Sequence, residues 1–125
     1  MARILVIDDD ELLRRFIVVL LERRAYSVQS TDSGETGIKL AAETDFDLVI
    51  TDIVMPGMEG LETIQQIRRH KPAIKILAVS GAGGSKGDYL QRAERVGANA
   101  ALAKPFEPVE FLDIVARLIN PAAPG

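Results

Sequence analysis

The sequence predicts an α/β protein with a doubly wound, five-stranded parallel sheet and helices on both faces. Short apolar segments of strand length alternate five times with longer segments in which apolar residues recur every three or four positions. This alternation is typical of βα units that form a parallel sheet. The chain has 125 residues, a length that suits one domain. We expect the domain to span residues 1–120 and residues 121–125 to form a flexible tail.

The predicted strands differ in how their apolar residues are arranged. They lie at residues 4–7, 26–30, 48–51, 74–79 and 99–103. The second strand alternates apolar and polar residues, which indicates an edge strand covered on one face, whereas the first, third and fourth are uniformly apolar and suit the middle. With right-handed crossovers, these preferences favour the order 2-1-3-4-5, which is flavodoxin-like.

The helices are predicted from apolar stripes and from residues typical of helix ends. The stripe of the first helix, expected to face the core, is Leu13, Phe16, Ile17, Leu20 and Leu21, and the arginines around it are expected to be solvated.

Several single residues indicate where helices begin and end. Asp10 suits the N-cap of the first helix. Asp32, followed three residues later by Glu35, resembles a capping box at the start of the second helix. A fourth helix from about residue 86 should stop at Gly97, and Pro108 suits the first turn of the last helix.

The composition argues against several classes of protein. There is no Cys, so disulfides and thiolate metal sites are impossible. The net charge of -3 argues against direct binding of nucleic acid. No apolar run is long enough to span a bilayer, and no signal peptide is visible, so we expect a soluble, cytoplasmic protein without membrane contact.

Polar residues follow four of the five predicted strands at the point where each strand ends. Asp8 and Asp9 follow the first strand, Asp52 the third, Ser80 the fourth and Lys104 the last. Because the carboxyl ends of parallel strands meet at one edge, these residues should form one site, with Asp8, Asp9 and Asp52 beside the crevice between the first and third strands.

The residue types in this site suit phosphoryl transfer. Carboxylates with open coordination positions suit Mg²⁺, and Lys104 can pair with a phosphate as a point charge. Ser80 can donate a hydrogen bond to a phosphoryl oxygen. A carboxylate nucleophile beside these groups is what formation of an aspartyl phosphate requires.

In these motifs the chain resembles the receiver domains of two-component response regulators. The resemblance covers residues 2–120 and rests on four motifs, which are Asp8-Asp9, Asp52 followed by Met55-Pro56-Gly57-Met58-Glu59-Gly60, Ser80-Gly81 and Lys104-Pro105-Phe106. It implies that Asp52 accepts a phosphoryl group from a sensor histidine kinase or a histidine phosphotransfer protein. It also implies a cis peptide bond between Lys104 and Pro105.

The resemblance implies a metal site and a mode of signalling as well. Mg²⁺ would be held by Asp9, Asp52 and the backbone carbonyl of Val54, with Asp8 as an outer-shell partner. We expect no enzymatic activity other than slow autodephosphorylation. We also expect a monomer or weak dimer that signals to a downstream protein through the fourth helix and the last strand. Most receivers carry an aromatic residue where this chain has Ala101.

Two alternatives from other classes remain open at this stage. Asp8-Asp9-Asp10 resembles the start of haloacid-dehalogenase-type phosphatases, in which Asp8 would be the nucleophile, although Leu12 departs from that pattern. A flavodoxin-like cofactor binder is the other alternative. It would need a glycine- or hydroxyl-rich phosphate loop after the first strand, where this chain has acids.

Overall fold

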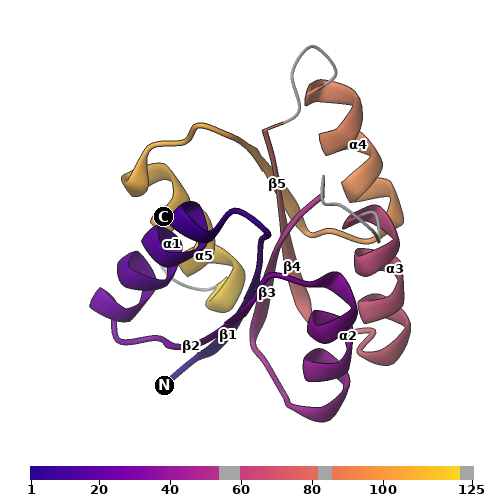
Figure 1. Ribbon diagram of the computed structural model, residues 1–125, viewed down its shortest axis with the longest axis horizontal. Helices are drawn as coiled ribbons and strands as arrows, with labels where there is room; N and C mark the ends of the chain where they lie inside the picture. Colours follow the sequence, from indigo (N-terminus) through magenta and orange to yellow (C-terminus); the bar gives the residue numbers. More distant parts are fainter. Residues whose placement is uncertain (54–59, 82–85, 122–125) are drawn as a thin grey trace.

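The five predicted strands form a single parallel sheet in the order β2-β1-β3-β4-β5, which confirms the predicted topology (Figure 1). The computed structural model describes residues 1–53, 60–81 and 86–121, and within residues 86–90 it describes the backbone alone. The strands are β1 (Arg3–Ile7), β2 (Ser27–Thr31), β3 (Leu48–Asp52), β4 (Lys75–Ser80) and β5 (Ala100–Ala103). The segment predicted as a tail lies almost entirely outside these residues, so that part of the domain division stays a prediction.

The helices lie on both faces of the sheet, so the fold is doubly wound as predicted. They are α1 (Glu11–Arg23), α2 (Gly34–Glu43), α3 (Gly60–His70), α4 (Lys86–Val96) and α5 (Pro108–Ile119). Helices α1 and α5 cover one face, and α2, α3 and α4 cover the other (Figure 1). Within the described ranges, no helix combines the length and the apolar character that a membrane span requires.

The central strands bury side chains on both faces, whereas β2 does not. In β1, Ile4 and Val6 pack into the core under α1 and α5, while Leu5 and Ile7 pack into the core under α2 and α3. The residues of β2 are exposed or only partly buried. The sequence pattern therefore distinguishes edge from centre because only a central parallel strand must be apolar at every position.

The starts of α1 and α5 follow the sequence prediction, and the start of α2 contradicts it. Asp10 caps α1 by accepting a hydrogen bond from the Leu13 amide at 3.1 Å, and Pro108 opens α5. The prediction that Asp32 caps the second helix is wrong. That helix begins one residue later, and Ser33 caps it by accepting a bond from the Thr36 amide.

Helices α1 and α4 end in the same hydrogen-bonded turn, but with different residues in the left-handed position. After α4, Gly97 has φ +126°, and the predicted stop is confirmed. After α1, Ala25 has φ +67°; its amide bonds the Glu22 carbonyl, and the Tyr26 amide bonds the Leu21 carbonyl. A left-handed conformation costs a residue with a Cβ energy that glycine does not lose.

Ala25→Gly should therefore stabilise the protein. Relief of left-handed strain, about 1–2 kcal/mol, outweighs the extra backbone entropy of glycine in the unfolded chain, about 0.4–1 kcal/mol. Urea denaturation of both proteins should show a higher midpoint with an unchanged slope. Gly97→Ala is the matched opposite change and should lower the midpoint. A lower midpoint for Ala25→Gly would contradict this account.

Candidate functional site

The residues predicted to form one site are brought to the carboxyl edge of the sheet. The carboxylate oxygens of Asp8, Asp9 and Asp52 lie within 4.8 Å of one another. Asp8 and Asp52 are buried, and Asp9 is exposed to solvent. They stand at the ends of the adjacent strands β1 and β3, where the direction of winding changes and ligands bind in folds of this kind.

Lys104 bridges two of these acids from the far side of the site. Its Nζ atom lies 3.0 Å from Asp8 Oδ2 and 3.0 Å from Asp52 Oδ2. The Lys104 amide donates to the Ser80 carbonyl at 2.8 Å, which joins the end of β5 to the end of β4. The peptide bond that follows, between Lys104 and Pro105, is cis as the resemblance implies.

The ionisation of Asp8 and Lys104 reflects burial and their mutual contact. Burial raises the pKa of the Asp8 carboxyl, and the hydrogen bond from the Asp10 amide and the charge of Lys104 offset only part of that effect. Burial alone would lower the pKa of Lys104, but the charges of Asp52 and Asp8 outweigh it and raise that pKa. The ammonium ion is thus stabilised by the acids it bridges.

Two of the four acids after β1, Asp8 and Asp10, have separate roles. Asp8 is oriented by its backbone neighbours, because the Asp10 amide donates to Asp8 Oδ1 at 2.9 Å. Asp10 itself caps α1 and lies outside the acid cluster, as expected from its sequence position. Arg14 contradicts the prediction of a purely solvated arginine face, since its guanidinium donates to the Asp8 carbonyl at 2.8 Å.

Ser80 completes the part of the site that the structure describes. It is fully buried at the end of β4, in register with Ala103, one residue before Lys104. Val54, whose carbonyl the resemblance assigns to the metal, lies outside the described residues. The donor set that is described consists of three carboxylates, the hard oxygen ligands that suit Mg²⁺.

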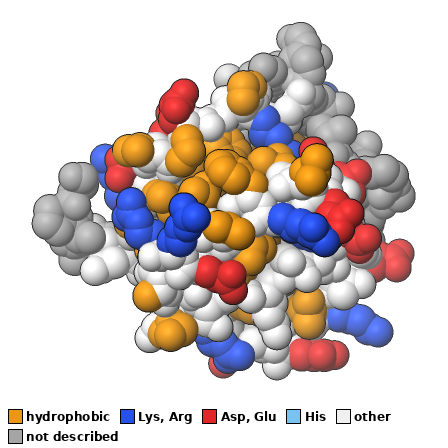
Figure 2. Space-filling view, turned by 60° about the vertical axis from the view of Figure 1, so that its left-hand side comes forward, with side chains coloured by type: hydrophobic (Ala, Val, Ile, Leu, Met, Phe, Trp, Pro, Cys, Tyr) orange, Lys and Arg blue, Asp and Glu red, His pale blue; other side chains and the backbone are white. Residues whose placement is uncertain are grey.

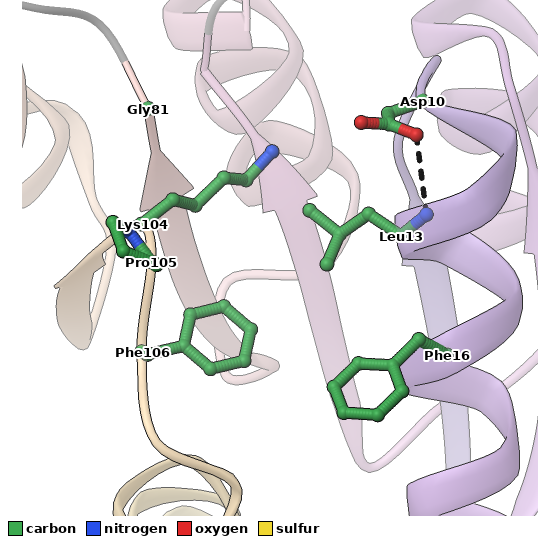
Figure 3. Close-up of a pocket in the computed structure, with 7 residues that line it drawn as sticks. All are labelled: Asp10, Leu13, Phe16, Gly81, Lys104, Pro105 and Phe106. Atoms are coloured by element: carbon green, nitrogen blue, oxygen red, sulfur yellow. Dashed lines mark hydrogen bonds between the residues drawn. The ribbon is translucent and has the colours of Figure 1, made fainter.

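An apolar pocket adjoins the site between α1 and the segment after β5. It has a volume of about 430 Å³ and is lined by Asp10, Leu13, Phe16, Gly81, Lys104, Pro105 and Phe106. Figure 3 shows the rings of Phe16 and Phe106 on opposite sides of this pocket, with the Lys104 side chain extending above them. The prediction that Phe16 faces the core is wrong, since it is 45% exposed.

Sequence reasoning missed Phe16 because helix periodicity does not separate a core stripe from a second apolar stripe beside it. Leu12, Phe16 and Val19 follow one another at intervals of four and three residues and are all exposed. The fully buried residues of the same helix are Ile17 and Leu21. The sequence did contain a signal, because apolar residues lie on more than one face of this helix. One stripe is enough to pack against the core, so a second stripe indicates an exposed apolar surface.

The fold and site define an α/β protein with a cluster of acids and a bridging lysine at the switch point of its sheet. A family model described as the response regulator receiver domain matches residues 4–116. The chain therefore belongs to the response regulator receiver domain family of two-component systems. The haloacid-dehalogenase-type and cofactor-binding alternatives receive no support from these comparisons.

Curated relatives are longer than this chain. ResD of Bacillus subtilis, a transcriptional regulatory protein, is 34% identical over 122 residues, which are 98% of this chain and 50% of ResD. NtrC of Azospirillum brasilense, a DNA-binding transcriptional regulator, is 36% identical over 123 residues, 98% of this chain and 25% of NtrC. The chain thus spans half the length of one relative and a quarter of the other.

Solved structures share the fold over nearly the whole chain. A CheY-like receiver domain protein from Methanospirillum hungatei has a TM-score of 0.90 at 26% identity, with 97% of this chain and 95% of that chain covered. TrrA from Thermotoga maritima, solved in complex with Mg²⁺ and BeF, has a TM-score of 0.84 at 31% identity, with 94% of this chain and 99% of that chain covered.

Lys104→Met should destabilise the metal-free protein most strongly at neutral pH. Removing one partner of a buried ion pair costs roughly 3–5 kcal/mol, and we expect about 2 kcal/mol here because Lys104 retains some contact with water. A carboxyl whose folded pKa is raised stabilises the fold below its unfolded pKa and loses that contribution as pH rises through the folded pKa.

Without Lys104, the folded pKa of Asp8 should rise further, so the difference in stability from wild type should shrink as the pH falls toward 4. Urea unfolding in EDTA between pH 4 and pH 7 measures this difference. Lys71→Met, which breaks the exposed pair with Asp45, is the control and should change stability little at either pH. A loss for Lys104→Met that is equal at both pH values would contradict the electrostatic account.

Proposed function

We propose that this protein is a phosphoacceptor of a two-component system in which Asp52 accepts a phosphoryl group from a phosphohistidine donor. The observation that supports this most directly is the contact of Lys104 with both Asp52 and Asp8. The ammonium group of Lys104 lies against the proposed acceptor carboxylate and a second buried acid, and Ser80 is buried at the end of the neighbouring strand β4. Membership of the receiver family supports the same assignment.

Each residue has a distinct role in the proposed transfer. A carboxylate oxygen of Asp52 forms a bond to phosphorus while the bond from phosphorus to the donor's imidazole nitrogen breaks. Lys104 exchanges part of its contact with the acids for contact with the transferred phosphoryl oxygens, and Ser80 donates a hydrogen bond to another of them. Asp9 and Asp52, with Asp8 as an outer-shell partner, would hold Mg²⁺, which would supply positive charge to the phosphoryl oxygens.

The output of the protein is a proposal of the same kind. ResD and NtrC are regulators of transcription, but this chain covers only part of either. We expect a downstream protein to bind around α4 and β5. No aromatic switch operates at Ala101, because a methyl group has no alternative rotamers. A cytoplasmic location and a monomeric or weakly dimeric state stay predictions.

Asp52→Asn should abolish labelling. The amide keeps the size of the side chain but is not a nucleophile and removes one charge from the metal site. Wild-type protein incubated with acetyl phosphate and Mg²⁺ should gain the mass of one phosphoryl group. It should gain none when EDTA is present from the start, and the variant should gain none under either condition. Asp10→Ala, which removes a helix cap and leaves the acid cluster intact, is the control and should still be labelled. Full labelling of Asp52→Asn would overturn the assignment.

The donor protein should dock on the apolar surface of α1 beside the site. Leu12 is 80% exposed, Phe16 and Val19 are 45% exposed, and Phe16 lines the pocket that Lys104 also lines. In Figure 2, hydrophobic side chains gather in the middle of this side of the molecule, with charged side chains around them. A phosphohistidine that reaches Asp52 brings its own protein over this surface, and an apolar anchor in a pocket is a typical source of binding energy.

Phe16→Ala should slow transfer from a protein donor without slowing transfer from acetyl phosphate. Loss of an apolar anchor costs roughly 1–2 kcal/mol, which corresponds to about a tenfold lower rate at subsaturating donor. Transfer from a phosphorylated histidine phosphotransfer domain that labels the wild type measures this rate. Val19→Ala, equally exposed on the same surface but outside the pocket, should slow transfer much less, because contacts around an anchor contribute little binding energy. Equal rates for both variants would refute the pocket as the anchor.

A further inference from the structure

The peptide group between Asp52 and Ile53 lies at the end of β3, where the pairing with β4 extends one residue further than the pairing with β1. The register of β3 with β1 ends at the pair of Ile7 and Thr51. The register with β4 continues one residue further, to Asp52 and Val79, and the Ile53 amide donates to the Val79 carbonyl at 3.1 Å. The Asp52 carbonyl therefore lies past the last paired residue on the β1 side, and Asp52 itself is buried.

The Thr51 side chain supplies a hydrogen bond to this carbonyl. Its hydroxyl, Oγ1, donates to the Asp52 oxygen at 3.0 Å, and Thr51 is fully buried. A buried carbonyl needs hydrogen-bond donors, and the Thr51 hydroxyl is one donor to this carbonyl at the end of the strand. A threonine at this position, in a strand that is otherwise apolar apart from Asp52, therefore has a local structural use.

Gly60, the first residue of α3, closes the other side of the same peptide group. A Cβ atom on Gly60 would lie 2.2 Å from the Ile53 Cα and 2.4 Å from the Asp52 carbonyl oxygen, distances at which backbone atoms overlap. The start of α3 thus rests directly against the residue that bears the acceptor carboxylate. Movement of the peptide toward α3 is blocked by this close contact.

We propose that Thr51 is a positioning residue for phosphoryl transfer, which acts by fixing the Asp52–Ile53 peptide group against Gly60. This inference rests on the function proposed for Asp52. The carbonyl carbon and the Cβ atom of Asp52 are both bonded to its Cα, so a shift of the peptide group that moves this Cα also moves the carboxylate. The Thr51 hydroxyl and the close approach of Gly60 hold this peptide group together with the hydrogen bond from its amide to Val79. A fixed peptide group keeps the Asp52 carboxylate in contact with Lys104.

The test compares Thr51→Val, which has the same shape without the hydroxyl, with Thr51→Ser, which keeps the hydroxyl. Thr51→Val should be labelled by acetyl phosphate roughly tenfold more slowly than wild type, since misplacement of a reacting group by about an ångström costs up to about 100-fold. Its Mg²⁺ affinity, measured by isothermal titration calorimetry, should also be lower. Thr51→Ser should restore both quantities.

A variant destabilised at the opposite edge of the sheet separates positioning from stability. Asn99 accepts hydrogen bonds from the Ile76 amide and from Arg68 at the start of β4 and β5, so Asn99→Ala should lower Tm without changing labelling or Mg²⁺ affinity. If Thr51→Val lowers Tm but leaves both site readouts at wild-type values, as Asn99→Ala should, the inference is overturned. If the wild type itself is not labelled, the proposed function fails, and an unchanged Mg²⁺ affinity in Thr51→Val then refutes the positioning role separately.

Discussion

The bridge from Lys104 to Asp8 and Asp52 is the interaction on which the rest of the site depends. Two buried carboxylates at the ends of neighbouring strands repel each other, and burial already raises the pKa of Asp8. Lys104 compensates this charge from a third strand at 3.0 Å to each acid. A single positive charge thus links β1, β3 and β5 across the edge of the sheet. Any species that binds the acids or the ammonium ion changes the balance among all three strands.

The remainder of the fold keeps those three strand ends in place. The central strands β1, β3 and β4 bury side chains on both faces, so the polar site residues lie at the ends of the strands. At the opposite edge, Arg68 donates to the carbonyls of Pro72, Ile74 and Gly97 and to the Asn99 side chain. One guanidinium with no acid partner in these contacts thus joins the end of α3 to the turn between α4 and β5.

Much of this architecture follows from local chemistry and was predictable from the sequence. The strand order depends on which strands are uniformly apolar, and the acids, Ser80 and Lys104 follow from the rule that parallel strands end together. The features that could not be predicted depend on how each helix is rotated on the sheet and on the residue at which it begins. Whether Phe16 faces the core or solvent is decided by the rotation of α1 on the sheet, and the cap of α2 is decided by a one-residue shift of its start. Such shifts change the free energy of folding little, and they hardly alter the spacing of apolar residues in the sequence.

The hydrogen bonds of Arg68 also fix one end of α4 to the sheet. The Ala98 amide bonds the Ala93 carbonyl, and Gly97 is held by Arg68, so the end of α4 farthest from the acids is fixed to the sheet. The side chains between this helix and β5 are small, with Ala93 and Ala98 buried and Ala101 packed against the same core. Methyl groups interlock less than large side chains, so the interface offers little resistance to a small change in the angle of the helix. The end of α4 at Gly97 is therefore the fixed point about which any change in the angle of this helix would occur.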